Sequence, residues 1–167
     1  MDEQAAEEFR EFMHGRWPSM VRLAYGLTGD QGHAEDVVQA AFARAYAPWP
    51  VVRRSGNPDA YVRQIVVNES RNRFRKRRVA ERLTDQLPER GVADATGHHD
   101  ERLALIAALQ RLGPRQRAVV VLRYWVGLTE TEAAVTLGCS VGTVKSQASR
   151  ALAAHRASTE LVDGGLS

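Results

Sequence analysis

Residues 128–152 read LTETEAAVTLGCSVGTVKSQASRAL, and this stretch decides the fold of the second half of the chain. Thr129, followed three residues later by Glu132, forms the pattern of a capping box, which predicts that a helix begins here. Gly138 can adopt the left-handed conformation that ends a helix, and Ser140 can cap the next one. The stretch therefore predicts two helices joined by a tight turn.

The second of these helices carries an apolar side and a polar side. We expect the apolar side to pack inward, with Val144 as the anchor, through Val144, Ala148, Ala151 and Leu152. Together with the small Ala134 in the first helix, this pattern is typical of a helix-turn-helix, whose second helix fits the major groove of DNA. The candidate DNA-binding residues on the outward side are Thr143, Lys145, Ser146, Ser149 and Arg150. An ordinary helical hairpin is the alternative interpretation.

A second motif lies near the middle of the chain, where residues 71–78 read RNRFRKRR. Just upstream, Tyr61, Ile65, Asn68 and Asn72 fall on one face of a predicted helix that starts at Pro58 and runs to about residue 78. Aromatic rings stack on bases, amides read base edges and arginines hold phosphates, so this face suits single-stranded nucleic acid. The candidate residues are Tyr61, Asn68, Asn72, Arg71, Arg73 and Arg75. Alternatively, the basic residues only complement the dipole of their own helix.

The distribution of charge supports two separate contacts with a polyanion. The net charge is only +3, but residues 51–82 carry ten basic and three acidic side chains, and residues 102–157 carry eight and two. Residues 83–101, between them, carry one basic and five acidic side chains. Basic runs are also common on solvated surfaces, and that interpretation stays open for each block taken alone.

Helix-forming residues and apolar spacing at helical intervals extend over most of the chain. Further helices are predicted over residues 2–16 and 20–27, separated by a break at Trp17-Pro18-Ser19, over 34–45, and from 101 onward. The fold class is all-α, with two small helical domains at residues 1–82 and 101–157, a flexible acidic linker at 83–100 and a frayed tail at 158–167. When the protein is free, we expect the domains to move independently or to dock loosely through the linker.

Several classes of protein are disfavoured by what the chain lacks. No apolar run approaches the roughly 20 residues of a membrane helix, the N-terminus does not resemble a secretory signal, and Cys139 has no partner for a disulfide. We therefore expect a cytoplasmic protein with no membrane insertion. The adjacent His98 and His99 lie in the acidic segment, and no metal-ligand spacing, phosphate-binding glycine loop or nucleophile elbow occurs. No catalytic residue, metal or cofactor is expected, and the chain is not expected to be an enzyme.

With these motifs in view, the chain resembles the extracytoplasmic-function (ECF) sigma factors of bacterial RNA polymerase. Residues 23–30 and 34–39, LAYGLTGD and AEDVVQ, look like the start of the sigma-two domain. Residues 58–68, PDAYVRQIVVN, are similar to the promoter-melting helix of that domain. Residues 108–146, which include the helix-turn-helix, are similar to the sigma-four domain.

The resemblance implies an alternative sigma factor that binds the clamp and flap regions of core RNA polymerase and directs it to promoter DNA. The sigma-two domain would dock on the clamp through residues 34–42 and capture melted bases of the −10 element, while the sigma-four domain would read the −35 element as duplex. The polymerase-binding residues carried over are Asp36, Val37, Gln39 and Phe42. An anti-sigma factor is a further candidate partner. The alternative function is a helix-turn-helix regulator of the response-regulator type, whose α/β receiver needs strands that residues 1–82 do not suggest.

Overall fold

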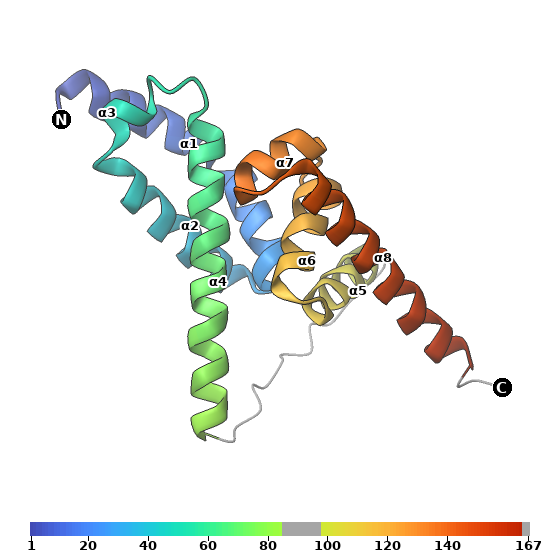
Figure 1. Ribbon diagram of the computed structural model, residues 1–167. Helices are drawn as coiled ribbons and strands as arrows, with labels where there is room; N and C mark the ends of the chain where they lie inside the picture. Colours follow the sequence, from blue (N-terminus) through green and yellow to red (C-terminus); the bar gives the residue numbers. More distant parts are fainter. Residues whose placement is uncertain (85–97, 165–167) are drawn as a thin grey trace.

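The structure is a computed structural model that describes residues 1–84 and 98–164, and Figure 1 shows its arrangement. Within these two ranges the regular elements are all helices, which confirms the predicted all-α class. Most of the expected linker, residues 85–97, lies outside the described residues.

The first domain is made of α1 (Glu3–Thr28), α2 (Gln31–Tyr46), the short α3 (Trp49–Val52) and the long α4 (Pro58–Thr84). The tight connection between α1 and α2 follows from its sequence, because Gly29 takes a left-handed φ of 73° at the end of α1. The side chain of Asp30 then caps α2 by accepting a hydrogen bond from the backbone N–H of His33 at 2.9 Å. Helix α4 packs across both α1 and α2, so the basic helix is held by the core of this domain (Figure 1).

The predicted break at Trp17-Pro18-Ser19 is wrong, because α1 continues through Pro18 without interruption. A proline inside a helix costs about 3 kcal/mol, since it removes one backbone hydrogen bond and crowds the preceding turn. On both sides of the proline, however, α1 buries large apolar side chains, including Phe9 before it and Met20 and Leu23 after it. Each such burial contributes about 1.5–3 kcal/mol, so packing on α2 outweighs the local penalty.

The second domain contains α5 (His98–Arg111), α6 (Pro114–Val120), the π-helical turn η1 (Val121–Trp125), α7 (Glu130–Leu137) and α8 (Val141–Gly164). The helices expected from residue 101 onward are confirmed; α6 begins at Pro114, which suits the first position of a helix, and it continues directly into the π turn. The frayed tail expected from residue 158 is wrong for most of its length, because the backbone of α8 stays helical to Gly164.

The two domains share one connected set of buried apolar side chains. Leu23, Val37 and Val66 belong to the core of the first domain, and Leu122 and Val144 to that of the second. The last turns of α1 lie against η1 and α5, and α4 packs on α7 (Figure 1). Independent or loosely docked domains are expected from the sequence, whereas in the structure the two domains pack directly against each other.

Candidate nucleic-acid interface

The helix-turn-helix forms with the local interactions that its sequence predicts. The hydroxyl of Thr129 accepts a hydrogen bond from the backbone N–H of Glu132 at 3.1 Å and so caps α7. Gly138 ends α7 with a φ of 66°, in the left-handed region. The hydroxyl of Ser140 then accepts from the backbone N–H of Thr143 at 3.1 Å and caps α8. These two caps and the left-handed turn at Gly138 fix the direction in which α8 leaves the turn.

Burial along α8 separates an inner from an outer side. The anchor Val144 is completely buried, Ala151 is buried and Ala148 is half-buried against the core, as expected. Leu152, predicted to face inward, is instead 44% exposed. All five candidate DNA-binding residues are exposed: Thr143, Lys145, Ser146, Ser149 and Arg150.

A carboxylate on α7 lies next to the outer side of α8. The Glu130 carboxylate is 3.7 Å from the Lys145 ammonium group and 3.9 Å from the Arg123 guanidinium. The side chain of Lys145 is 64% exposed, and ion pairs at such positions contribute about 0–1 kcal/mol to stability. Lys145 is therefore free to exchange Glu130 for a phosphate.

On α4 the candidate residues differ in how they are displayed. Tyr61 and Asn68 are exposed on the same face, as the predicted spacing requires. Further along, Asn72 is half-buried and its side-chain oxygen accepts a hydrogen bond from Arg75 at 2.8 Å. Tyr61 and Asn68 are thus the two groups of this face that are most open to an incoming base.

Arg71, the remaining candidate next to Asn72, points toward the second domain. Burial is the main cause that lowers the pKa of its guanidinium, with a further contribution from the nearby positive charge of Arg115. The guanidinium nonetheless stays protonated at neutral pH. Its Nε is buried without a hydrogen-bond partner. In this arrangement Arg71 is half-buried and is less open to nucleic acid than Tyr61 and Asn68.

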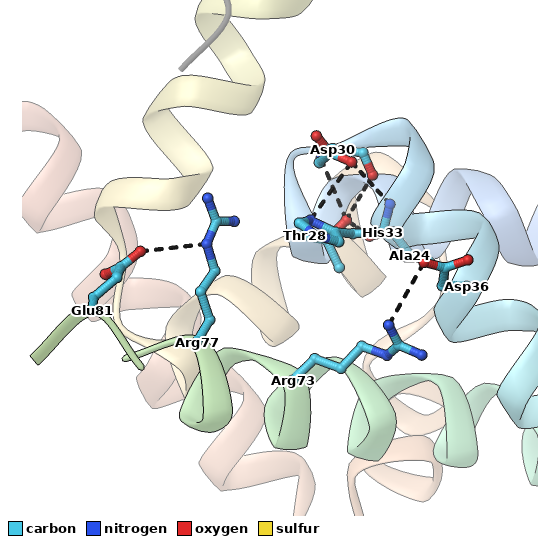
Figure 2. Close-up of polar contacts among 8 residues, drawn as sticks. All are labelled: Ala24, Thr28, Asp30, His33, Asp36, Arg73, Arg77 and Glu81. Carbon is cyan, nitrogen blue, oxygen red and sulfur yellow. Dashed lines mark hydrogen bonds and ion pairs between the residues drawn. The ribbon is translucent and has the colours of Figure 1, made fainter. Parts of the chain in front are cut away.

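Two ion pairs connect the helix expected to bind polymerase with the helix expected to bind DNA. The Arg44 guanidinium of α2 lies 2.7 Å from the Glu69 carboxylate of α4. Figure 2 shows Arg73 of α4 reaching toward Asp36 of α2, with 3.8 Å between guanidinium and carboxylate. The same view shows the turn between α1 and α2, where the Thr28 hydroxyl donates to the carbonyl of Ala24 at 2.9 Å. Arg77 of α4 instead pairs within its own helix. The pair between Asp36 and Arg73 places the two candidate surfaces side by side.

The four residues carried over for polymerase binding fall into two groups. Asp36 and Gln39 are exposed on α2, whereas Val37 and Phe42 are buried in the core of the first domain. The Phe42 ring packs against the rings of Phe9 and Trp17, with centroids 6.2 and 6.1 Å apart. The exposed pair can meet a partner directly, and the buried pair holds α2 in position.

Arg117 is a residue of structural importance that the sequence pattern does not reveal. It is only 5% exposed, and its guanidinium lies 5.2 Å from the centroid of the Phe74 ring. Burial lowers its pKa, and the charge is compensated by backbone carbonyls at the ends of two helices. The carbonyls that accept its hydrogen bonds are those of Leu109, Gln110 and Leu112 at 3.0 Å and of Leu27 at 3.2 Å. In a sequence, a charged residue in a basic segment is expected to lie on the surface. Only the structure shows that Arg117 is buried and bonded to backbone carbonyls.

The structure combines a helix-turn-helix that has an exposed outer face with a separate basic helix that displays an aromatic ring and an amide. This combination is typical of a two-domain helical nucleic-acid-binding protein. Among the described residues, no group of three or more His, Cys, Asp or Glu side chains is arranged to hold a metal ion. None of the helices that the structure describes has the length and apolar character needed to cross a membrane.

Comparison with known proteins identifies the family. The model of Sigma-70 region 2 matches residues 17–79, and that of Sigma-70 region 4 matches residues 102–154. The chain is 41% identical over 149 residues to the RNA polymerase sigma-E factor of Streptomyces coelicolor, covering 89% of this chain and 84% of that protein. It is 34% identical over 143 residues to the ECF RNA polymerase sigma factor SigL of Mycobacterium tuberculosis, covering 81% of this chain and 79% of the relative.

Among solved structures, the sigma factor RpoE from Bartonella quintana, in complex with the anti-sigma factor NepR, matches with a TM-score of 0.73 and 27% identity. The match covers 87% of this chain and 92% of that one. The chain belongs to the sigma-70 family of RNA polymerase sigma factors, in its ECF group.

Proposed function

We infer that this chain is an alternative sigma factor, which binds core RNA polymerase and directs it to a subset of promoters. The observation that carries the inference is that the two family models match, in order, the two parts of the chain that bear the basic helix and the helix-turn-helix. The alternative, a response regulator, does not fit, because residues 17–79 match Sigma-70 region 2 and the first domain is helical over its described residues. Sigma factors are initiation factors, so the chemistry of polymerisation belongs to the polymerase, and the place of action is the cytoplasm.

The exposed groups described above support a division of labour among three helices. The outer side of α8 reads the −35 element as duplex, and Tyr61 and Asn68 of α4 receive melted bases of the −10 element. Asp36 and Gln39 of α2 contact the polymerase clamp, while the second domain meets the flap. Because the solved relative is a complex with an anti-sigma factor, a protein of that class is proposed as a further partner.

Run-off transcription with purified core polymerase on a library of genomic fragments tests this function. We expect initiation from a small, reproducible set of fragments that depends on addition of the chain. Core polymerase that gains no promoter-dependent initiation from the chain, at any concentration, would contradict the proposal.

Asn68→Ala should impair open-complex formation more than closed-complex binding, by roughly tenfold if one hydrogen bond of about 1.4 kcal/mol is lost. An amide that reads a base matters only once the base has left the stack. Permanganate footprinting on duplex and on pre-melted templates separates the two steps. The matched comparison is Asn72→Ala, which we expect to have a smaller effect because that side chain is half-buried and bonded to Arg75.

Equal defects on duplex and pre-melted templates would mean that Asn68 contacts single strand without driving melting. A variant with no defect on either template would show that the amide does not read a base.

A further inference from the structure

Arginines from both domains lie where the domains meet, and two of them are paired with backbone acceptors. The Arg22 guanidinium of α1 donates to the carbonyl oxygen of Trp125 at 3.1 Å, and the indole Nε1 of Trp125 donates back to the carbonyl oxygen of Arg22 at 2.8 Å. Arg117 of α6 is bonded to the carbonyls described above. Arg71 of α4 differs, because its Nε is buried without a hydrogen-bond partner. A buried N–H group without an acceptor is unfavourable, so an acceptor supplied from outside the chain would stabilise it.

Arg71 and Arg117 line the same hollow between α4 and α6. The other residues that line it are apolar except Ser70, whose hydroxyl donates to the carbonyl oxygen of Val66 at 2.9 Å. The hollow therefore presents two guanidinium groups between apolar walls. Such walls exclude water and strengthen the attraction between a guanidinium and an anion.

The positive charge around this hollow has no counter-ion within the described residues. None of Arg71, Arg115 and Arg117 forms an ion pair there. Burial lowers the pKa of the Arg71 guanidinium, and the charges of Arg115 and Arg75 lower it further. The contribution in the opposite direction comes from the thiol of Cys139 and not from a carboxylate. An anion in the hollow would offset this repulsion.

The size of the hollow limits the ligand to a small group. Its empty volume is about 270 Å³ with the open mouth included, which is below the roughly 300–1,000 Å³ of pockets that enclose drug-sized molecules. Guanidinium groups match the oxygens of phosphate in a planar, bidentate geometry. A phosphate within a DNA strand carries a sugar on each side, for which the hollow has no room. A free or terminal phosphate is the better fit.

We propose that the hollow between α4 and α6 binds a small anion of the phosphate class. Arg71 donates hydrogen bonds to its oxygens, the neighbouring Arg115 adds a second cation, and Arg117, whose N–H groups are largely engaged by carbonyls, contributes its charge. The anion is either inorganic phosphate or the terminal phosphate of a nucleotide. This site is separate from the outer side of α8 and from Tyr61 and Asn68, so it goes beyond the function proposed above.

Thermal melting of the full chain tests the site. Sodium phosphate is added to a phosphate-free buffer, and sodium chloride keeps the ionic strength constant. If the Kd is about 1 mM, 10 mM phosphate should raise Tm by about 3–6 °C. Arg71→Met, which keeps an apolar stem but donates no hydrogen bond, should lose most of this shift. The matched control is Arg78→Met, which removes an exposed cation from the same helix and should keep the shift.

Isothermal titration calorimetry with inorganic phosphate gives the affinity directly. We expect Arg71→Met to raise the Kd at least about tenfold, the equivalent of one charged hydrogen bond. Arg115→Met should raise it less, because that side chain is exposed. Without phosphate, Arg71→Met should be no less stable than the wild type, since its guanidinium Nε has no acceptor to lose. Circular dichroism checks that helix content is unchanged.

Two further ligands identify the source of the phosphate. GTP that binds with the same Kd as inorganic phosphate would assign the free ion. GTP that binds at least tenfold more tightly, with the gain lost in Arg71→Met, would assign the terminal phosphate of a nucleotide. A single-stranded oligonucleotide should not displace inorganic phosphate. Displacement would overturn the assignment to a small anion and return Arg71 to the −10 strand.

Phosphate also stabilises proteins in general, by exclusion from their surfaces. Equal shifts in Tm for the wild type, Arg71→Met and Arg115→Met would show that general effect alone and would overturn the site. A wild type that releases or absorbs no heat and gains no stability with phosphate would overturn it as well. None of these measurements uses polymerase, so their failure leaves the proposed function intact.

Discussion

Arg117→Met is expected to destabilise the protein by about 3–5 kcal/mol, as is typical when one partner of a buried charged network is removed. Methionine fills a similar volume but donates no hydrogen bond, so four backbone carbonyls that now accept from the guanidinium lose their partner. Each buried acceptor left without a donor costs about 1–3 kcal/mol, and relaxation of the α5–α6 turn recovers part of this.

Chemical denaturation and thermal melting measure this effect. For a chain of this size, each kcal/mol corresponds to about 2–4 °C in Tm, so a loss of about 10 °C is expected. Arg115→Met is the matched control, because Arg115 is exposed on the same helix and should change stability little. Arg117→Lys should fall in between, since one ammonium group cannot reach carbonyls at the ends of two helices. Equal stabilities for the variants at 115 and 117 would contradict the role assigned to Arg117.

Removing both cations from the outer side of α8 is expected to weaken binding to −35 duplex about sixtyfold at 0.1 M salt. Each phosphate contact contributes a slope of about 0.9 to the plot of log affinity against log salt concentration. One contact therefore raises the affinity about eightfold when the salt concentration falls from 1 M to 0.1 M. The double variant Lys145→Ala and Arg150→Ala should therefore reduce the salt slope by about two, and each single variant by about one. Fluorescence anisotropy over a salt series measures both quantities.

Two further variants of the same protein make the assignment specific. Glu130→Gln should act in the opposite direction and tighten binding, because that carboxylate lies 3.7 Å from the Lys145 ammonium group. Arg156→Ala removes an exposed cation on the same side of α8 as Lys145, but about three turns further along the helix than Lys145, and should leave the slope unchanged. If it lowers the slope as much as the variants at 145 and 150, the DNA contacts extend further along α8 than assigned.

Local signals in the sequence were sufficient for the helix-turn-helix. The sequence predicts a cap at Thr129, a left-handed turn at Gly138 and a cap at Ser140, and all three form. Each of them depends only on interactions between residues no more than four positions apart. The break at Pro18 could not be judged in this way, because the burial of Phe9 and Leu23 that outweighs it depends on a partner helix distant in sequence.

The candidate site shows the same division between local and tertiary information. Helical spacing correctly placed Tyr61 and Asn68 on one exposed face of α4. It could not show that Arg71 turns toward the second domain, because that depends on how two separate units pack. The sequence also does not reveal the buried position of Arg117, because its partners are backbone carbonyls, which carry no signature in the sequence.

The position of Trp125 gives the protein a built-in optical reporter. The chain has three tryptophans, and Trp17 and Trp49 lie among the aromatic rings of the first domain, away from the contact between Trp125 and Arg22. With those two replaced by phenylalanine, the remaining indole would emit at shorter wavelength while it is half-covered and at longer wavelength once water reaches it. The emission spectrum would then record, without any attached dye and on the millisecond scale of rapid mixing, any change in the contact between Trp125 and the first domain when promoter DNA is added.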